Sequence, residues 1–335
     1  MARCSRHHRI LAAAPFAWIG ADPITVKINT GVDGTQLPSC PLLRVIPTHL
    51  VWAGPAESLA SQVHTFLAVV GRAHVVALTV HLYRLDLMDD ALAGQLMQDP
   101  SLQRLQSLTL WSHTRRLIEL ACQLPLLATL TLESRLHEAD APLLSTAPAL
   151  IDLSVADPES DSGCVPLVLQ CPKLRRLAVS GFWVTDLPSF SAGLGWPQLR
   201  ELSISPHSGW GQVLPEQSNA IAAAFSSLQS ILVLTLAGEN LDPLLAHVHR
   251  IPTLRRLVID CSGWGVSLHC SDAALRSLLR SSPSLIVEWS ISPGGSERLK
   301  SLLRPLVAGS GGKLRLIEEV SPQGQPSRLR LMHDA

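Results

Sequence analysis

The chain has 335 residues, of which 47% are hydrophobic and only 4% aromatic, so any core that it builds has to be aliphatic. Its 27 basic residues equal its 27 acidic residues, and this balance gives no overall field that would attract nucleic acid or an anionic membrane. The seven cysteines are an odd number for a disulfide framework, and no two of them have the C-x-x-C spacing of a zinc or redox centre. We therefore expect an intracellular protein, cytoplasmic or nuclear, that needs no cofactor or metal and binds neither nucleic acid nor membrane.

Residues 1–21 allow a second interpretation of where the protein acts. Arg3, Arg6 and Arg9 precede an apolar run, Ile10 to Ala21, which is typical of a signal or transit peptide. Pro15 interrupts this run and no clear small-x-small cleavage site follows it. A secreted or organellar protein is therefore an alternative. No stretch is long enough and free enough of charge to predict a transmembrane helix.

The pattern Leu-x-x-Leu-x-aliphatic recurs along most of the remaining chain. Clear copies lie at residues 105–110, 127–132, 150–155, 174–179, 199–204, 231–236 and 254–259, with a weaker copy at 75–80 and a degenerate one at 285–291. The last apolar positions of successive copies are 22 to 32 residues apart. Leucine-rich repeats have a period of about 20–29 residues, and the longer intervals indicate inserted loops.

Each copy predicts a short strand, because Leu alternates with a small residue over its last positions. Between the strands, segments such as 114–124 and 272–282 place leucines at helical spacing, and Ser271 and Asp272 favour a helix start. Prolines, for example Pro125 and Pro283, stop each helix before the next strand. One such unit cannot bury its own leucines, whereas stacked units can.

The sequence therefore predicts an α/β fold, a leucine-rich-repeat solenoid or horseshoe with parallel strands on the concave face and helices on the convex face. Residues 22–70 form an N-terminal cap region in this interpretation, and residues 71–292 form the repeats. Residues 293–335 form a C-terminal cap and a loose tail, with a last helix after Gly294, a strand at 313–320 and an irregular end.

Repeats that contain the phrase C-P-x-L-x-x-L, as residues 171–177 do, resemble the F-box/leucine-rich-repeat proteins of the divergent set in mushroom-forming fungi. Residues 4–19 look like the end of an F-box, in which Cys4, Pro15, Trp18 and Ile19 match the family pattern. The earlier L-P-x-E segment of an F-box does not occur in this sequence, so we expect residues 1–21 to be a truncated F-box remnant. The resemblance implies a ubiquitin-ligase adaptor whose repeats hold a protein substrate and whose F-box docks on a Skp-type adaptor.

The residues that flank the inward leucines are expected on the concave face, where a partner would bind. The central column is small, and charges of both signs lie beside it. The candidate partner-binding residues are Trp111, Asp152, Arg176, Glu201 and Arg256. The alternative is a solvated face with self-compensating pairs, such as Asp152 with Arg176 on adjacent strands.

Three tryptophans in glycine-containing loops form a possible rim of this site, Trp183, Trp210 and Trp264. Glycine beside each ring favours a tight turn that presents it, and exposed Trp is enriched at binding hot spots. The alternative is that each ring covers the end of the aliphatic core.

Catalytic motifs are absent: the sequence has no H-E-x-x-H, G-x-S-x-G or G-x-G-x-x-G. Residues 309–314 lack the glycine spacing of a phosphate loop, and the histidine pair His247 and His249 has no ligand partners at suitable spacing. We therefore expect a protein that is not an enzyme. It would be a protein-binding repeat module, most like the substrate-recognition part of an F-box protein, and the alternative is a repeat scaffold with no ligase link.

Overall fold

The computed structural model describes residues 25–29, 49–55, 77–83, 99–100, 102–111, 115–137, 139–156, 171–182, 198–206, 215–237, 241–260, 270–290, 296–311, 313–320 and 326–333. The F-box remnant expected at residues 1–21 lies outside these ranges. The chain divides into two compact units. Unit 1 comprises Met1–Arg135 and Ala139–Leu153, and unit 2 comprises Leu136–Glu138 and Ser154–Ala335.

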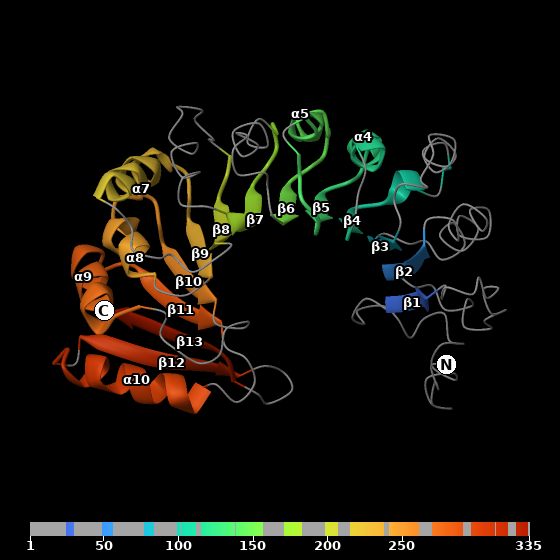
Figure 1. The fold of residues 1–335 in the computed structure, drawn as a ribbon. Coiled ribbons are helices and arrows are strands. Elements are labelled where there is room, and N and C mark those ends of the chain that lie inside the picture. Colours follow the sequence, from blue (N-terminus) through green and yellow to red (C-terminus); the bar gives the residue numbers. More distant parts are fainter. Residues whose placement is uncertain are drawn as a thin grey trace, which may run out of the picture. The chain divides into compact units, whose positions relative to one another are not determined.

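Unit 1 contains parallel strands that pair in chain order (Figure 1). These strands are β1 (Thr25–Asn29), β2 (His49–Pro55), β3 (Ala77–Tyr83), β4 (Ser107–Leu110) and β5 (Thr129–Leu132). A short 3-10 helix, η3 (Leu102–Arg104), precedes β4, and the helices α4 (Arg115–Gln123) and α5 (Ala141–Leu144) follow β4 and β5. Strand β6 (Asp152–Ala156) begins in unit 1 and ends in unit 2.

Unit 2 continues the same alternation of strand and helix. Its parallel strands are β7 (Arg176–Phe182), β8 (Glu201–Pro206), β9 (Val233–Ala237), β10 (Arg256–Asp260) and β11 (Ile286–Ser290). Its helices are α7 (Pro215–Ser227), α8 (Asp242–Val248), α9 (Asp272–Ser281) and α10 (Ser296–Ala308). In Figure 1 these helices lie on one side of the unit 2 strands, and no described helix covers the other side.

The end of unit 2 differs from the loose tail that the sequence predicts for it. Strand β12 (Leu314–Val320) confirms the strand expected at 313–320, but residues 326–333 also form a strand, β13 (Pro326–His333). β13 pairs antiparallel with both β11 and β12. The reason is burial, because Leu329 and Leu331 alternate with arginines and are both 0% exposed.

The recurring leucines form the core of both units. The three apolar positions of each copy from residue 105 to residue 259 are buried, except Leu254, which is partly exposed. In unit 2, pairing places Leu177, Leu202, Leu234 and Leu257 side by side on successive strands. A row of neighbouring leucines on a pleated sheet presents one continuous apolar surface, which the helices cover.

Helix α9 shows how local sequence sets the ends of these elements. The Ser271 side chain accepts a hydrogen bond from the Ala274 N–H at 3.1 Å, so the predicted cap is confirmed. Leu275, Leu278 and Leu279 face the core, and the helix ends just before Pro283.

A second row of contacts recurs at the points where the strands begin. In unit 1, the carbonyl oxygen of Gln106 accepts the N–H groups of both Ala128 and Thr129, and that of Ala128 accepts those of Ile151 and Asp152, at 2.9–3.0 Å. In unit 2 the equivalent acceptors are the carbonyl oxygens of Arg175, Arg200, Leu232 and Arg255. We call these positions the entry column: Gln106, Ala128 and Ile151 in unit 1, and Arg175, Arg200, Leu232 and Arg255 in unit 2.

Candidate binding surface

The side of the unit 2 sheet that carries no described helix is its open face. One row across it comprises Arg176, Glu201, Val233, Arg256 and Ile286, which pair in register from β7 to β11. The next row comprises Ala178, Ser203, Thr235, Val258 and Glu288. All of these side chains except Glu288 are at least partly exposed. The second row is small or uncharged until it reaches β11.

The structure places three of the five predicted binding residues in one row of the open face. Arg176 and Glu201 lie opposite each other on adjacent strands and are both exposed. Arg256 lies two strands beyond Glu201, with Val233 between them. Trp111, which is 50% exposed after β4, and Asp152, at the start of β6, belong to unit 1. The rim residues Trp183, Trp210 and Trp264 lie outside the described residues.

Glu288 is a buried charge on the open face that sequence analysis missed. Its side chain is only 1% exposed, although its neighbours in the row are accessible. Arg330 of β13 lies opposite Glu288 and donates its Nε–H to Glu288 Oε1. The Arg256 Nη1 atom lies 3.7 Å from Glu288 Oε2. A buried carboxylate is tolerated when opposite charges surround it, and here two guanidinium groups do so.

This ion cluster changes the interpretation of Arg256. The sequence predicts Arg256 on the concave face as a partner-binding residue. In the structure its side chain is 35% exposed, its Nε atom is buried without a hydrogen-bond partner, and its charge is committed to Glu288. Arg256 therefore supports the sheet whether or not it also contacts a partner. The alternation of Arg with Leu at 328–331 is a signal for a strand that places Arg328 and Arg330 on the face opposite its leucines.

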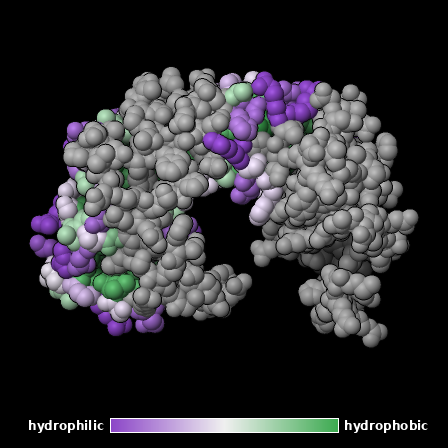
Figure 2. All heavy atoms as spheres, viewed as in Figure 1, coloured by the Kyte–Doolittle hydropathy of each residue, from purple (hydrophilic) through white to green (hydrophobic). Residues whose placement is uncertain are grey.

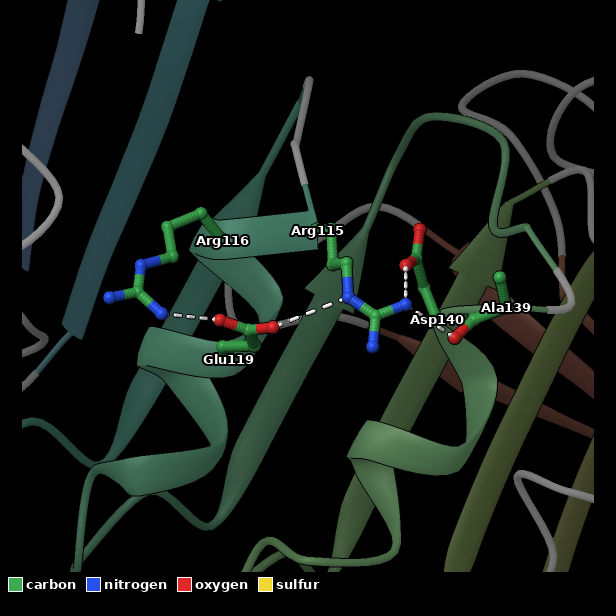
Figure 3. A network of polar contacts seen from close by, with 5 residues as sticks. All are labelled: Arg115, Arg116, Glu119, Ala139 and Asp140. Atoms are coloured by element: carbon green, nitrogen blue, oxygen red, sulfur yellow. Dashed lines mark hydrogen bonds and ion pairs between the residues drawn. The ribbon is translucent and has the colours of Figure 1, made fainter. Parts of the chain in front are cut away.

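The helical side of unit 1 carries a second charged cluster (Figure 3). Glu119 accepts hydrogen bonds from Arg115 Nε at 3.3 Å and from Arg116 Nη1 at 2.6 Å. Arg115 also reaches the next helix, where its Nη1 donates to Ala139 O at 3.0 Å and to Asp140 Oδ1 at 3.4 Å. The hydrogen bond from Arg116, assisted by Arg115, holds the pKa of Glu119 below its usual value. The charges of the two arginines and the two carboxylates balance. Through Arg115, the cluster links α4 to the residues that directly precede α5.

A serine–histidine pair joins α7 and α8. Ser218 Oγ lies 2.8 Å from His247 Nε2. Burial, with the nearby charges of Arg250 and His249, lowers the pKa of His247, so the ring is neutral at pH 7. A hydrolytic triad needs a third group on the other ring nitrogen, but His247 Nδ1 is buried and has no hydrogen-bond partner. The arrangement is that of a structural contact.

Two further observations concern the reactivity of Cys122 and the grouping of metal-binding side chains. Burial raises the pKa of the Cys122 thiol to about 12, which keeps it protonated and unreactive. No three His, Cys, Asp or Glu side chains among the described residues gather closely enough to hold a metal ion.

Two large apolar side chains of the entry columns are exposed, Ile151 at 36% and Leu232 at 39%. Figure 2 shows mainly hydrophilic residues on the described surface that is in view, with one apolar area over α10 and β12. No described helix has both the length and the apolar composition needed to cross a membrane. No protein-family model matches the chain, and a comparison with curated proteins gives no match either.

Proposed function

We propose that the chain is a non-catalytic protein-binding module, a leucine-rich-repeat solenoid that receives a protein partner on the open face of unit 2. The observation that supports this proposal most directly is the row of Arg176 and Glu201 beside the small residues Ala178 and Ser203. Opposite charges stand in register and exposed, and the small side chains next to them leave room for a partner.

The backbone beneath this row suits recognition. Neighbouring strands hold their side chains about 4.8 Å apart, so a ligand can contact several strands at once. Because the strands are already hydrogen-bonded to each other, little conformational entropy is lost when a partner binds. Charges of both signs fit a polar protein surface, whose own charges can be matched position by position.

A photo-crosslinking experiment tests the open face without knowledge of the partner. A photo-reactive phenylalanine analogue replaces Ser203 on the open face or, as a matched control, exposed Ser277 on α9. We expect crosslinked proteins from position 203 that are absent from position 277. The double variant Arg176→Ala, Glu201→Ala should lose them while its circular dichroism spectrum stays unchanged. The same set of proteins from both positions would contradict the proposal.

The resemblance of residues 4–19 to the end of an F-box extends the proposal to a ubiquitin ligase, in which the repeats would select the substrate. A pull-down with a purified Skp-type adaptor tests this link separately. The resemblance rests on four matching residues, Cys4, Pro15, Trp18 and Ile19, so we expect weak binding or none. Binding at micromolar affinity would contradict that expectation and support the ligase link, whereas no binding favours a scaffold.

A further inference from the structure

The entry column of unit 2 is strongly basic at the edge where its strands begin. Arg175, Arg200 and Arg255 are exposed there, and Leu232 lies between Arg200 and Arg255. Lys173, two residues before Arg175, is also exposed. We call Lys173, Arg175, Arg200, Leu232 and Arg255 the basic edge.

Positive charge is concentrated at this edge, although the chain as a whole is neutral. The segments that lead into β7, β8, β9 and β10 are residues 171–177, 198–202, 229–234 and 252–257. They contain six basic residues and a single acidic one, Glu201. Two of these six, Arg176 and Arg256, lie on the open face and are left aside. Lys173, Arg175 and Arg255 make no ion pair with any described residue, so their charge is available to a ligand.

The fold does not need this charge. The entry column is held by backbone hydrogen bonds, which any residue can make, and unit 1 forms the same bonds with Gln106 and Ala128. Arg175 and Arg200 occupy adjacent strands, where like charges repel each other. The repulsion costs stability, and the side chains of Arg175 and Arg255 make no contact that the backbone pattern requires, which points to a role in binding an anionic partner.

The basic edge is also rigid. Arg200 Nη1 donates to Ser230 O at 3.1 Å in the turn before β9. The hydroxyl of Thr253, in the turn before β10, donates to Ile231 O at 2.8 Å and lies 3.2 Å from Gln229 O. These contacts join successive turns, so the cationic side chains extend from a fixed backbone and binding requires little ordering.

The order of side chains along the edge distinguishes between classes of anionic partner. Arg200 and Arg255 lie two strands apart, about 10 Å, and the side chain between them is Leu232, which is 39% exposed. A nucleic-acid backbone would gain nothing from an apolar side chain at this point. The entry segments also contain no aromatic residue on which a base could stack. A peptide with an apolar residue between acidic ones matches both the charges and the leucine.

We propose that the basic edge binds an acidic segment of a protein partner, with carboxylates on Arg175, Arg200 and Arg255 and an apolar side chain on Leu232. This inference rests on the proposed function in one respect, that the partner is a protein. It uses a different surface, because the basic edge borders the open face without including Arg176 or Glu201.

Fluorescence anisotropy tests the proposal on the full chain. The probe is a labelled peptide of repeated Glu-Glu-Leu-Glu-Glu units, and the comparison probes are the same peptide with Leu replaced by Ser and a single-stranded oligonucleotide of equal charge. The variant is Arg175→Ala, Arg255→Ala, which leaves the hydrogen bond of Arg200 to Ser230 intact. The matched control is Arg280→Ala, Arg304→Ala on α9 and α10, with the same change in net charge.

We expect the Arg175→Ala, Arg255→Ala variant to bind the leucine-containing peptide at least tenfold more weakly, and the control variant to bind it as the wild type does. Leu232→Ser should weaken binding of the leucine-containing peptide about threefold and leave binding of the serine peptide unchanged. Equal binding by the wild type and the Arg175→Ala, Arg255→Ala variant would overturn the proposal. So would tighter binding of the oligonucleotide with no effect of Leu232→Ser, which would indicate a nucleic-acid partner.

The two proposals can fail separately. If the peptide binds as expected but position 203 yields no specific crosslinks, the open face is not the partner site and the basic edge stands. If position 203 crosslinks a partner but the peptide binds equally to the Arg175→Ala, Arg255→Ala variant and to the wild type, the basic edge is wrong and the open face stands.

Discussion

The entry columns of the two units have the same backbone contacts and different side chains. In unit 1 the column is Gln106, Ala128 and Ile151, without a charge, whereas in unit 2 arginine occupies three of its four positions. In both, one carbonyl oxygen accepts two N–H groups from the next strand entry. The backbone therefore sets the geometry of this edge, and it does not constrain which side chains stand there. A difference in side chains at such positions is therefore a guide to function.

The charged clusters give a second comparison between the units. Glu119 in unit 1 and Glu288 in unit 2 each contact two arginines. The Glu119 side chain is 23% exposed on a helix, whereas that of Glu288 is 1% exposed on a sheet. The same kind of ion pairing therefore contributes differently to stability in the two units. Water screens the charges around Glu119 and hardly reaches those around Glu288.

Truncation of a core leucine should reduce stability the most, and by a similar amount in both units. Leu130 in β5 and Leu257 in β10 are both 0% exposed and hold the same place in the repeating pattern. Truncating either to Ala should lower the free energy of unfolding by about 2–5 kcal/mol. Urea denaturation followed by circular dichroism measures this. A wild-type midpoint for either variant would show that its strand does not contribute to a core in the same way.

The next effect sharpens the comparison of the two glutamates. Glu288→Gln removes the carboxylate between Arg256 and Arg330, which should lower the free energy of unfolding by about 1–3 kcal/mol. Glu119→Gln should have a smaller effect, because its arginines stay solvated. Exposed Glu297, replaced by Gln, serves as the control for loss of a charge. Equal urea midpoints for the Glu288 and Glu119 variants would mean that burial does not distinguish the two clusters.

His247 and Glu119 should have a smaller effect, on how the stability of the folded chain depends on pH. His247, in unit 2, has a pKa below its usual 6.5, so the unfolded chain takes up a proton before the folded chain does. Its contribution to stability is complete above pH 6.5 and falls as the pH decreases towards the folded pKa. Glu119, in unit 1, has a pKa below its usual 4.5, so its contribution is present above pH 4.5 and is lost as the pH falls through the folded pKa.

Urea midpoints measured between pH 4 and pH 8 separate these two contributions. We expect His247→Gln to flatten the decline between pH 7 and pH 6, and Glu119→Gln to leave that interval unchanged. If His247→Gln kept the wild-type slope there, His247 would not be the group that titrates.

Local sequence patterns were enough to predict the core, because the periodicities of strands and helices involve residues close together in the chain. Alternation of Leu with small residues specifies which side chains of each strand face inward, and this prediction holds for the copies from residue 105 to residue 259 with Leu254 as the exception. The start of α9 at Ser271 follows equally from a local rule, since the capping hydrogen bond spans three residues. A mixed α/β fold with mostly parallel strands follows from the same repetition.

Which charged side chains meet could not be predicted from the sequence, because their contacts are long-range. Glu288 and Arg330 are 42 residues apart, and the pattern around Glu288 gives no sign that it is buried. Their contact depends on the antiparallel pairing of β13 with β11, which is a long-range event that no local propensity encodes. The same holds for the basic edge. Arg175, Arg200 and Arg255 are scattered in the sequence, and they form one row with Leu232 because backbone hydrogen bonds between successive strand entries fix their order in space.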